Sequence, residues 1–218
     1  MKVGTDGVLL GAWAKCENAL NILDIGTGTG LIALMMSQRS QATIDAIEID
    51  RAAFGEALFN ITNSRWSDRI QVFRASLKEY SDMCLSKYDL IVSNPPYFSK
   101  SLLSPHKTRT LARHDSQLTL PDLFKGMEGL LTDAGTIQLI LPEESHLKAL
   151  ELSQNFGFYC VEKVWVKPTP KKAPKRVLLE FSRSENPIIE QELIIEDGGR
   201  HQYSDAYKQL TREYYLAF

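Results

Sequence analysis

Hydrophobic and polar residues alternate along the chain in two patterns. Short runs rich in Ile, Val and Leu predict strands, which we place at 22–25, 43–49, 70–74, 89–93, 136–141, 158–166 and 177–182. Longer stretches with apolar residues three and four positions apart predict helices at 30–37, 52–62, 120–131 and 144–155. Because strands and helices alternate, the sequence predicts an α/β domain with a mostly parallel, seven-stranded sheet.

The C-terminal third departs from this alternation. Only a turn rich in Pro and Lys separates the last two predicted strands, so we expect them to pair as an antiparallel hairpin within 163–182. The tail, 196–218, places four large side chains on one helical face: Tyr207, Leu210, Tyr214 and Tyr215. We expect the tail to pack on the body and the chain, 1–218, to form a single domain.

Composition agrees with one folded domain. Hydrophobic residues make up 44% of the chain, yet no apolar run approaches the length of a membrane span, and the N-terminus lacks a signal peptide. Cys16, Cys84 and Cys160 are far apart and lack the CxxC spacing, which favours reduced thiols over a disulfide framework or a zinc site. We therefore expect a soluble cytoplasmic protein without a metal.

Basic residues cluster in two segments of a chain whose net charge is −2. Segments 100–114 and 163–176 contain ten of the 25 Lys and Arg residues and no acidic residue. The rest of the chain therefore holds 15 basic and 27 acidic residues. Focused basic segments on an acidic body suit a phosphate-binding surface, whereas an ordinary solvated loop is the alternative for either segment alone.

A glycine-rich loop follows the first predicted strand in "NILDIGTGTGLIALMM". The pattern D-x-G-x-G-x-G begins at Asp24, and alternating glycines let backbone N–H groups approach a ligand at a helix N-terminus. Glu48 ends the next predicted strand, 18 residues after Gly30, where a carboxylate can accept hydrogen bonds from a ribose. Asp50 competes for that role but fits a helix N-cap better. A tight turn without a ligand is the other interpretation of the loop.

A second motif, "YDLIVSNPPY", ends the fourth predicted strand. Asn94 and Pro95 each offer an oxygen that can accept an N–H bond, and Pro95 and Pro96 fix φ and remove backbone donors. Tyr97 offers a face on which a planar group can stack. Such a constellation can orient a poorly nucleophilic planar nitrogen for attack. Without the glycine loop, a simple strand terminator would be the better interpretation.

The two motifs together resemble motifs I and IV of class I S-adenosylmethionine-dependent methyltransferases. The resemblance implies a Rossmann-like fold and S-adenosyl-L-methionine as cofactor. Its cofactor-binding residues would include the acid, the loop and the ribose-binding carboxylate: Asp24, Gly26, Thr27, Gly28, Gly30 and Glu48. The N-P-P-Y form is shared by enzymes that methylate N6 of adenine and by those that methylate glutamine in proteins.

The N-terminal "MKVGTDGVLLGAWA" is similar to bacterial enzymes that methylate N6 of adenine 37 in tRNA(Val), and the similarity extends to "YSDAYKQLTREYYLAF". It implies that Thr5 and Asp6 contact the cofactor, although both also fit an N-cap for a helix through Trp13. Ser76 stands where an Asp often contacts the cofactor adenine. Family members carry a further basic segment ahead of "KVGTDG", and we expect a missing arm to weaken RNA binding.

The same resemblance gives the basic segments a role in binding an anticodon stem-loop. The long stretch 98–115 follows the tetrapeptide directly, as an acceptor lid would. Expected phosphate contacts lie in this lid and in the hairpin: Lys100, Lys107, Arg109, Arg113, Lys171, Lys172, Lys175 and Arg176. We expect a monomeric enzyme. The alternatives are a glutamine methyltransferase, a DNA adenine methyltransferase, and a non-catalytic RNA-binding module.

Overall fold

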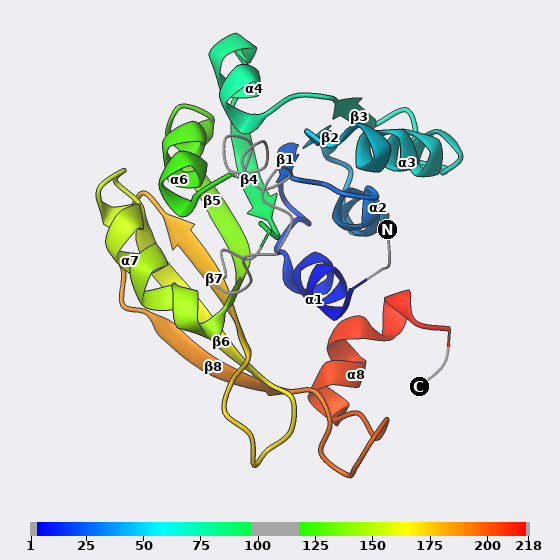
Figure 1. The fold of residues 1–218 in the computed structure, drawn as a ribbon, viewed down its shortest axis with the longest axis vertical. Helices are drawn as coiled ribbons and strands as arrows, with labels where there is room; N and C mark the ends of the chain where they lie inside the picture. The colour runs from blue at the N-terminus through cyan, green and yellow to red at the C-terminus, as the bar shows by residue number, and fades with distance from the viewer. Residues whose placement is uncertain (1–3, 97–117, 217–218) are drawn as a thin grey trace, which may run out of the picture.

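The computed structural model describes residues 4–96 and 118–216, and it is built around one twisted sheet (Figure 1). The strands are β1 (Asn21–Ile25), β2 (Thr43–Ile47), β3 (Ile70–Phe73), β4 (Tyr88–Ser93), β5 (Leu131–Pro142), β6 (Tyr159–Lys167), β7 (Arg176–Ser182) and β8 (Ile189–Ile194). Their order is β3-β2-β1-β4-β5-β7-β6-β8. The first five strands of that order run parallel, and β7 runs antiparallel to both of its neighbours. The predicted mostly parallel sheet and C-terminal hairpin are confirmed.

The strand count differs from the predicted seven because β8 adds an eighth, parallel to β6. Only Leu193 is buried among the residues of β8, so the sequence offers no apolar run there. Carboxylates of β8 instead bind lysines of β6: Glu190 lies 3.0 Å from Lys163, and Glu192 lies 2.8 Å from Lys167. Two lysines of the basic segment 163–176 thus already have acidic partners.

Helices cover both faces of the sheet (Figure 1). One face carries α1 (Thr5–Trp13), α2 (Leu31–Arg39), α3 (Arg51–Thr62) and α8 (Asp205–Thr211), which pack with one apolar cluster. The other face carries α4 (Leu77–Met83), α6 (Leu120–Glu128) and α7 (His146–Gln154), which pack with a second cluster. Short 3-10 turns, η1 (Glu143–Ser145) and η2 (Arg212–Tyr214), precede α7 and follow α8. Each strand of the sheet centre therefore has two buried faces, as its continuous apolar run requires.

Side-chain caps fix where several helices begin. Asp50 accepts from the backbone N–H groups of Ala52 and Ala53 at the start of α3, which confirms its predicted N-cap role. Ser76 and Glu79 form a capping box at the start of α4, a helix absent from the predicted elements. The N-cap of α1 is Gly4 and makes no side-chain bond, so the expected cap by Thr5 or Asp6 is wrong.

Helix α1 crosses α2 at close range through two glycines one turn apart. A Cβ at Gly7 would lie 3.2 Å from the Leu31 side chain, and one at Gly11 would lie 2.7 Å from the Met35 sulfur. The guanidinium of Arg39 then binds the carbonyl oxygens of Gly11 and Ala12 at the end of α1, each at 2.9 Å. Small residues thus place α1 against α2, and Arg39 satisfies the exposed helix end.

The predicted docking of the tail is confirmed. Tyr207 is buried in the apolar cluster that α1 and α2 cover. Leu210 packs with this cluster and also with a smaller one formed by Val8, Ala12 and Met35, and Tyr214 packs with the smaller cluster. The hydroxyls of Tyr207 and Tyr215 are 3.0 Å apart. Across residues 4–96 and 118–216, no helix has the length and apolar character needed to cross a membrane.

Candidate active site

Three strand ends meet at one edge of the sheet and bring the sequence motifs together. The last residue of β1, Ile25, pairs with Ile47 at the end of β2 and with Ser93 at the end of β4. The chain order reverses between β1 and β4, and such a switch point is where open α/β sheets form their ligand crevice. The loops that follow Ile25, Ile47 and Ser93 are those predicted to carry the chemistry.

The glycine loop has the left-handed backbone that its spacing predicts. Gly26, Gly28 and Gly30 have φ of 70°, 61° and 81°, a region that other L-residues rarely adopt. Gly30 has a second constraint, because a Cβ there would lie 3.0 Å from Cδ1 of Ile61. The loop is tied down where Gly26 and Thr27 donate N–H bonds to the Ile47 carbonyl at 2.9 and 3.0 Å.

Glu48 faces this loop directly after β2. Its Oε2 accepts from the Gly28 N–H at 2.9 Å, and its Oε1 accepts from the Asp50 N–H at 2.8 Å. A carboxylate has about four lone-pair positions, so Glu48 can still accept two ligand hydroxyls. Glu48 contacts the glycine loop through Gly28, whereas Asp50 caps α3, so Glu48 stays the candidate for the predicted ribose contact.

Asp24 lies beneath the loop and is fully buried. Its Oδ2 accepts from the Thr27 hydroxyl at 2.6 Å, whereas its Oδ1 accepts no hydrogen bond from the described residues. Burial raises the pKa of Asp24 to about 7, opposed by the Thr27 hydroxyl and the Ala33 backbone and reinforced by the negative charge of Glu48. A buried carboxylate with an unsatisfied oxygen favours a cationic or hydrogen-bond-donating ligand at this place.

Asn94, Pro95 and Pro96 follow β4 immediately and therefore adjoin the glycine loop. The Ser93 hydroxyl donates to the Ile25 carbonyl at 2.8 Å and so ties the start of the tetrapeptide to the start of the loop. Pro95 is buried, Asn94 is half-buried and Pro96 is exposed. Tyr97, the fourth residue of the motif, lies outside the described residues.

Ser76 is near this edge but is occupied by its capping box. Its hydroxyl donates to Oε2 of Glu79 at 2.7 Å and accepts from the Glu79 N–H at 3.2 Å. The β3 end is adjacent to the site, because the Glu48 N–H donates to the Phe73 carbonyl at 3.0 Å. The structure thus gives Ser76 a clear structural role beside its predicted cofactor contact.

The structure brings Asp6 and Arg176 together, although they were predicted for different ligands. The Arg176 Nε donates to Oδ2 of Asp6 at 2.9 Å. Thr5 lies beside Asp6 in the first turn of α1 and is exposed. No local sequence signal relates these elements, since 170 positions separate the partners of the ion pair.

The predicted phosphate contacts divide between described and undescribed residues. Lys171, Lys172 and Lys175 are exposed in the connection between β6 and β7, which extends beyond the sheet at the bottom of Figure 1. Because Arg176 begins β7 opposite Pro142 at the end of β5, this connection lies at the same sheet edge as the strand ends of the site. The predicted lid contacts lie outside the described residues: Lys100, Lys107, Arg109 and Arg113.

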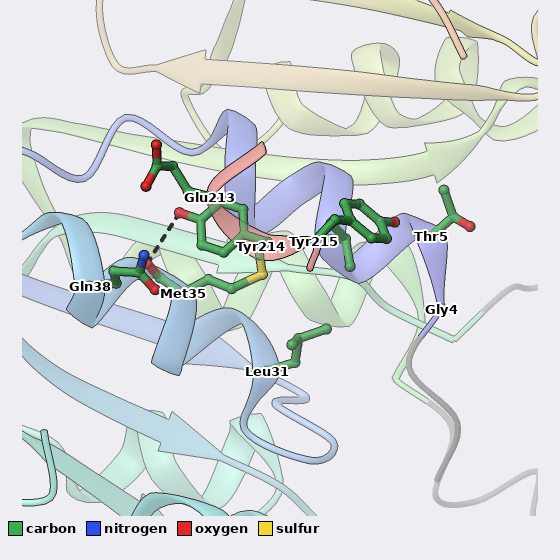
Figure 2. Close-up of a pocket in the computed structure, with 9 residues that line it drawn as sticks. Gly4, Thr5, Leu31, Met35, Gln38, Glu213, Tyr214 and Tyr215 are labelled. Carbon is green, nitrogen blue, oxygen red and sulfur yellow. Dashed lines mark hydrogen bonds between the residues drawn. The ribbon is translucent and has the colours of Figure 1, made fainter. Parts of the chain in front are cut away.

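A separate hollow of about 500 Å³ lies between the N-terminal end of α1, the outer side of α2 and η2. Figure 2 shows Tyr214 and Tyr215 over Leu31 and Met35, with Thr5 at one end. Leu31 follows Gly30, but Asn94 and Glu48 do not line this hollow. Within the described ranges, no group of three or more His, Cys, Asp or Glu side chains could hold a metal ion.

Comparison with known proteins identifies the family. The family model described as "Methyltransferase small domain" matches residues 6–163, which include α1 from Asp6 onward, the glycine loop and residues 94–96. The chain belongs to this family.

Relatives in the family match almost the whole chain. A tRNA1(Val) (adenine(37)-N6)-methyltransferase from Bacteroides thetaiotaomicron is 47% identical over 218 residues, covering 99% of this chain and 91% of the relative. A protein of the same name from Trichodesmium erythraeum is 44% identical over 221 residues, covering 100% and 92%. The family resemblance seen in the sequence is confirmed.

Solved structures of low sequence identity share the fold. A predicted O-methyltransferase from Agrobacterium tumefaciens superposes with a TM-score of 0.77 at 19% identity, covering 95% of this chain and 96% of that one. A ribosomal protein L11 methylase from Lactobacillus delbrueckii gives a TM-score of 0.59 at 20% identity, covering 82% and 78%. The class I methyltransferase fold is therefore established.

The family and the fold imply S-adenosylmethionine as the methyl donor, and the residues of the site fit it. Its amino group is a cation that suits the unsatisfied oxygen of Asp24, and its ribose diol suits Glu48. The left-handed glycines leave room for a ligand to approach the backbone. The protein is thus an S-adenosylmethionine-dependent methyltransferase.

Proposed function

We propose that this chain methylates N6 of adenine 37 in tRNA1(Val). The supporting observation is that Asn94 and Pro95 directly adjoin a complete cofactor loop, tied to it through Ser93 and Ile25. Relatives that carry this activity in their names match 91 to 92% of their own length. The placement of the motif and the extent of the match support the same chemistry.

The chain's own residues deal with the weak nucleophilicity of the acceptor. The exocyclic nitrogen of adenine is conjugated with the ring, so its lone pair must be directed out of the plane of the base before it can attack. The Asn94 side-chain oxygen and the Pro95 carbonyl each accept one N–H of the amino group, which orients the nitrogen and stabilises positive charge developing on it. Tyr97 supplies a stacking face for the base.

The donor and acceptor sides of the site have separate tasks. When bound, S-adenosylmethionine supplies a methyl group on a positively charged sulfur. Asp24 and Glu48 hold and orient the donor, while the glycine loop fixes the backbone around it. After transfer, the nitrogen loses one proton to solvent and neutral N6-methyladenine results.

Positive charges around the site bind the phosphates of the anticodon stem-loop. Lys171, Lys172 and Lys175 are exposed at the sheet edge that carries the site, and the lid 98–115 follows the tetrapeptide in sequence. These contacts supply affinity and orientation, not base choice. We also propose that the protein acts in the cytoplasm, where its tRNA substrate is found, and that it acts as a monomer.

The test is transfer of labelled methyl from S-adenosylmethionine to total tRNA from a strain lacking the corresponding gene. Nucleoside analysis should give labelled N6-methyladenosine. Asn94→Ala should reduce the rate by about a hundredfold or more, because it removes one of two acceptors that orient the nitrogen. RNA affinity, measured by filter binding, should stay near the wild-type value.

Two results would contradict the proposal. Label in a protein fraction, with none in RNA, would indicate a glutamine methyltransferase. Wild-type turnover in Asn94→Ala would show that the tetrapeptide does not orient the acceptor. A purified tRNA1(Val) transcript with adenine 37 replaced by guanine is the matched RNA control and should accept no methyl group.

A further inference from the structure

The ion pair between Asp6 and Arg176 connects two parts of the site that are distant in sequence. The Nε–Oδ2 distance is 2.9 Å, and the two side chains are only 21% and 28% exposed. A charge-assisted hydrogen bond in this partly shielded position is stronger than an ion pair between two fully exposed side chains.

On one side, Asp6 belongs to a helix turn that packs on the start of α2, directly after the cofactor loop. The next residue, Gly7, comes so close to α2 that a Cβ would lie 3.2 Å from the Leu31 side chain. Leu31 begins α2 directly after Gly30, the last glycine of the loop. The first turn of α1 therefore packs against the residue that directly follows the cofactor loop, and its position affects that end of the loop.

On the other side, Arg176 belongs to the acceptor half of the site. It begins β7 and pairs with Pro142 at the end of β5. Strand β5 in turn pairs with β4 through Leu139 and Ser93, the residue before Asn94. Arg176 is also at the base of the turn that carries the exposed lysines, because it directly follows Lys175.

We propose that Arg176 is a positioning residue for cofactor binding and couples the two halves of the site. By binding Asp6 it fixes the first turn of α1 against the start of α2, directly after the glycine loop. This proposal does not depend on which acceptor the enzyme methylates.

A simpler role for Arg176 would be a direct phosphate contact like that of Lys175. The two roles predict different losses of binding affinity when Arg176 is replaced. A positioning residue affects cofactor affinity without RNA, whereas a phosphate contact affects RNA affinity alone.

The decisive experiment is calorimetric binding of S-adenosylmethionine in the absence of RNA. Arg176→Gln and Asp6→Asn should each weaken binding by about tenfold, and the double variant should be no weaker than either single variant. Arg176→Lys should recover part of the loss, because it restores the charge without the planar guanidinium. In turnover assays, KM for S-adenosylmethionine should rise more than kcat falls. Thermal melting of each variant, with binding measured well below the midpoint, separates positioning from global unfolding.

Lys175→Gln is the matched control, since it removes a positive charge one position away on the exposed turn. It should weaken RNA binding and leave S-adenosylmethionine affinity unchanged. Unchanged cofactor affinity in Arg176→Gln, or additive losses in the double variant, would overturn the proposal. Failure to methylate tRNA would instead contradict the proposed function and leave the calorimetric result valid.

Discussion

At the scale of single residues, Asp24 carries a conflict between its burial and its charge. Its carboxyl is fully buried and has one unsatisfied oxygen, and burial raises its pKa to about 7. The ordinary value is 3.8, so the folded protein binds a proton that the unfolded chain releases between these two pH values. The contribution of Asp24 to the free energy of unfolding is therefore fully present below pH 4 and is lost as pH rises through 7.

This conflict gives a pH-dependent prediction. The free energy of unfolding of the ligand-free protein should lose on the order of 4 kcal/mol from Asp24 between pH 4 and pH 8. Asp24→Asn removes the ionisable group, so the free energy of unfolding of this variant should fall less than that of the wild type over the same pH range. Urea unfolding at several pH values measures the difference. Asp50→Asn, which keeps an N-cap side chain, is the control, and parallel curves for Asp24→Asn and the wild type would contradict the prediction.

Gly30 provides a second prediction at this scale. Gly30→Ala forces a left-handed φ of 81° on alanine and places its Cβ 3.0 Å from Ile61. Stability should fall by about 1 to 3 kcal/mol, with loss of cofactor binding. Gly55→Ala is the matched control, because Gly55 lies inside α3 with nothing within 4 Å of its Cβ position, and it should stabilise the protein by up to about 1 kcal/mol. Equal urea midpoints for the two variants would contradict this account.

At the scale of elements, the sequence predicted the strands and helices that have a local apolar or capping pattern. The central strands are buried on both faces, so their apolar runs were visible, and the Asp50 cap followed from its place before α3. Strand β8 was missed because only Leu193 of its residues is buried, and Glu190 and Glu192 pair with lysines of β6 instead of filling a core. Helix α4 had a detectable signal, the S-x-x-E capping box of Ser76 and Glu79.

The candidate site was predictable to a similar extent. The glycine loop and residues 94–96 were identified from their local motifs, and the structure then places them at one edge of the sheet. The ion pair between Asp6 and Arg176 was not, since no periodicity relates a helix turn to a strand 170 positions later. Nor does the sequence show that Lys163 and Lys167 are neutralised by β8.

The capping box yields a prediction for α4. Ser76→Ala removes the acceptor for the Glu79 N–H and should cost about 1 kcal/mol, or roughly 2 to 4 °C in melting temperature. If capping is the main role of Ser76, S-adenosylmethionine affinity should stay within about twofold of the wild type. Ser204→Ala, which removes the N-cap of α8, is a matched control for lost capping. A large fall in cofactor affinity specific to Ser76→Ala would establish a cofactor contact instead.

At the scale of the whole molecule, the charges are distributed so that an acidic protein can bind a polyanion. The net charge is −2, but β8 neutralises the inner lysines of the hairpin and leaves the positive charge at its exposed turn. The exposed lysines of the turn therefore place positive charge at the edge of the sheet that carries the site, where we expect RNA to bind.

Salt dependence tests this distribution. Replacing Lys171, Lys172 and Lys175 together with Gln should weaken tRNA binding and reduce the slope of log K against log salt by about 2, since each phosphate contact contributes 0.7 to 0.9. A triple Gln variant at Lys78 in α4, Lys87 just before β4 and Lys125 in α6 controls for net charge. Equal slopes for the two triple variants would show that the hairpin turn does not bind phosphate.

The Asp6–Arg176 pair also has a consequence for protein synthesis. A ribosome makes α1 long before it makes β7, so a growing chain holds Asp6 without its partner for 170 residues of translation. Strands β1, β2 and β4 can pair in that interval, whereas the first turn of α1 forms its ion pair only when Arg176 emerges. A product that stops short of β7 would thus carry the complete glycine loop and tetrapeptide, yet lack the contact that holds the first turn of α1 to the C-terminal hairpin.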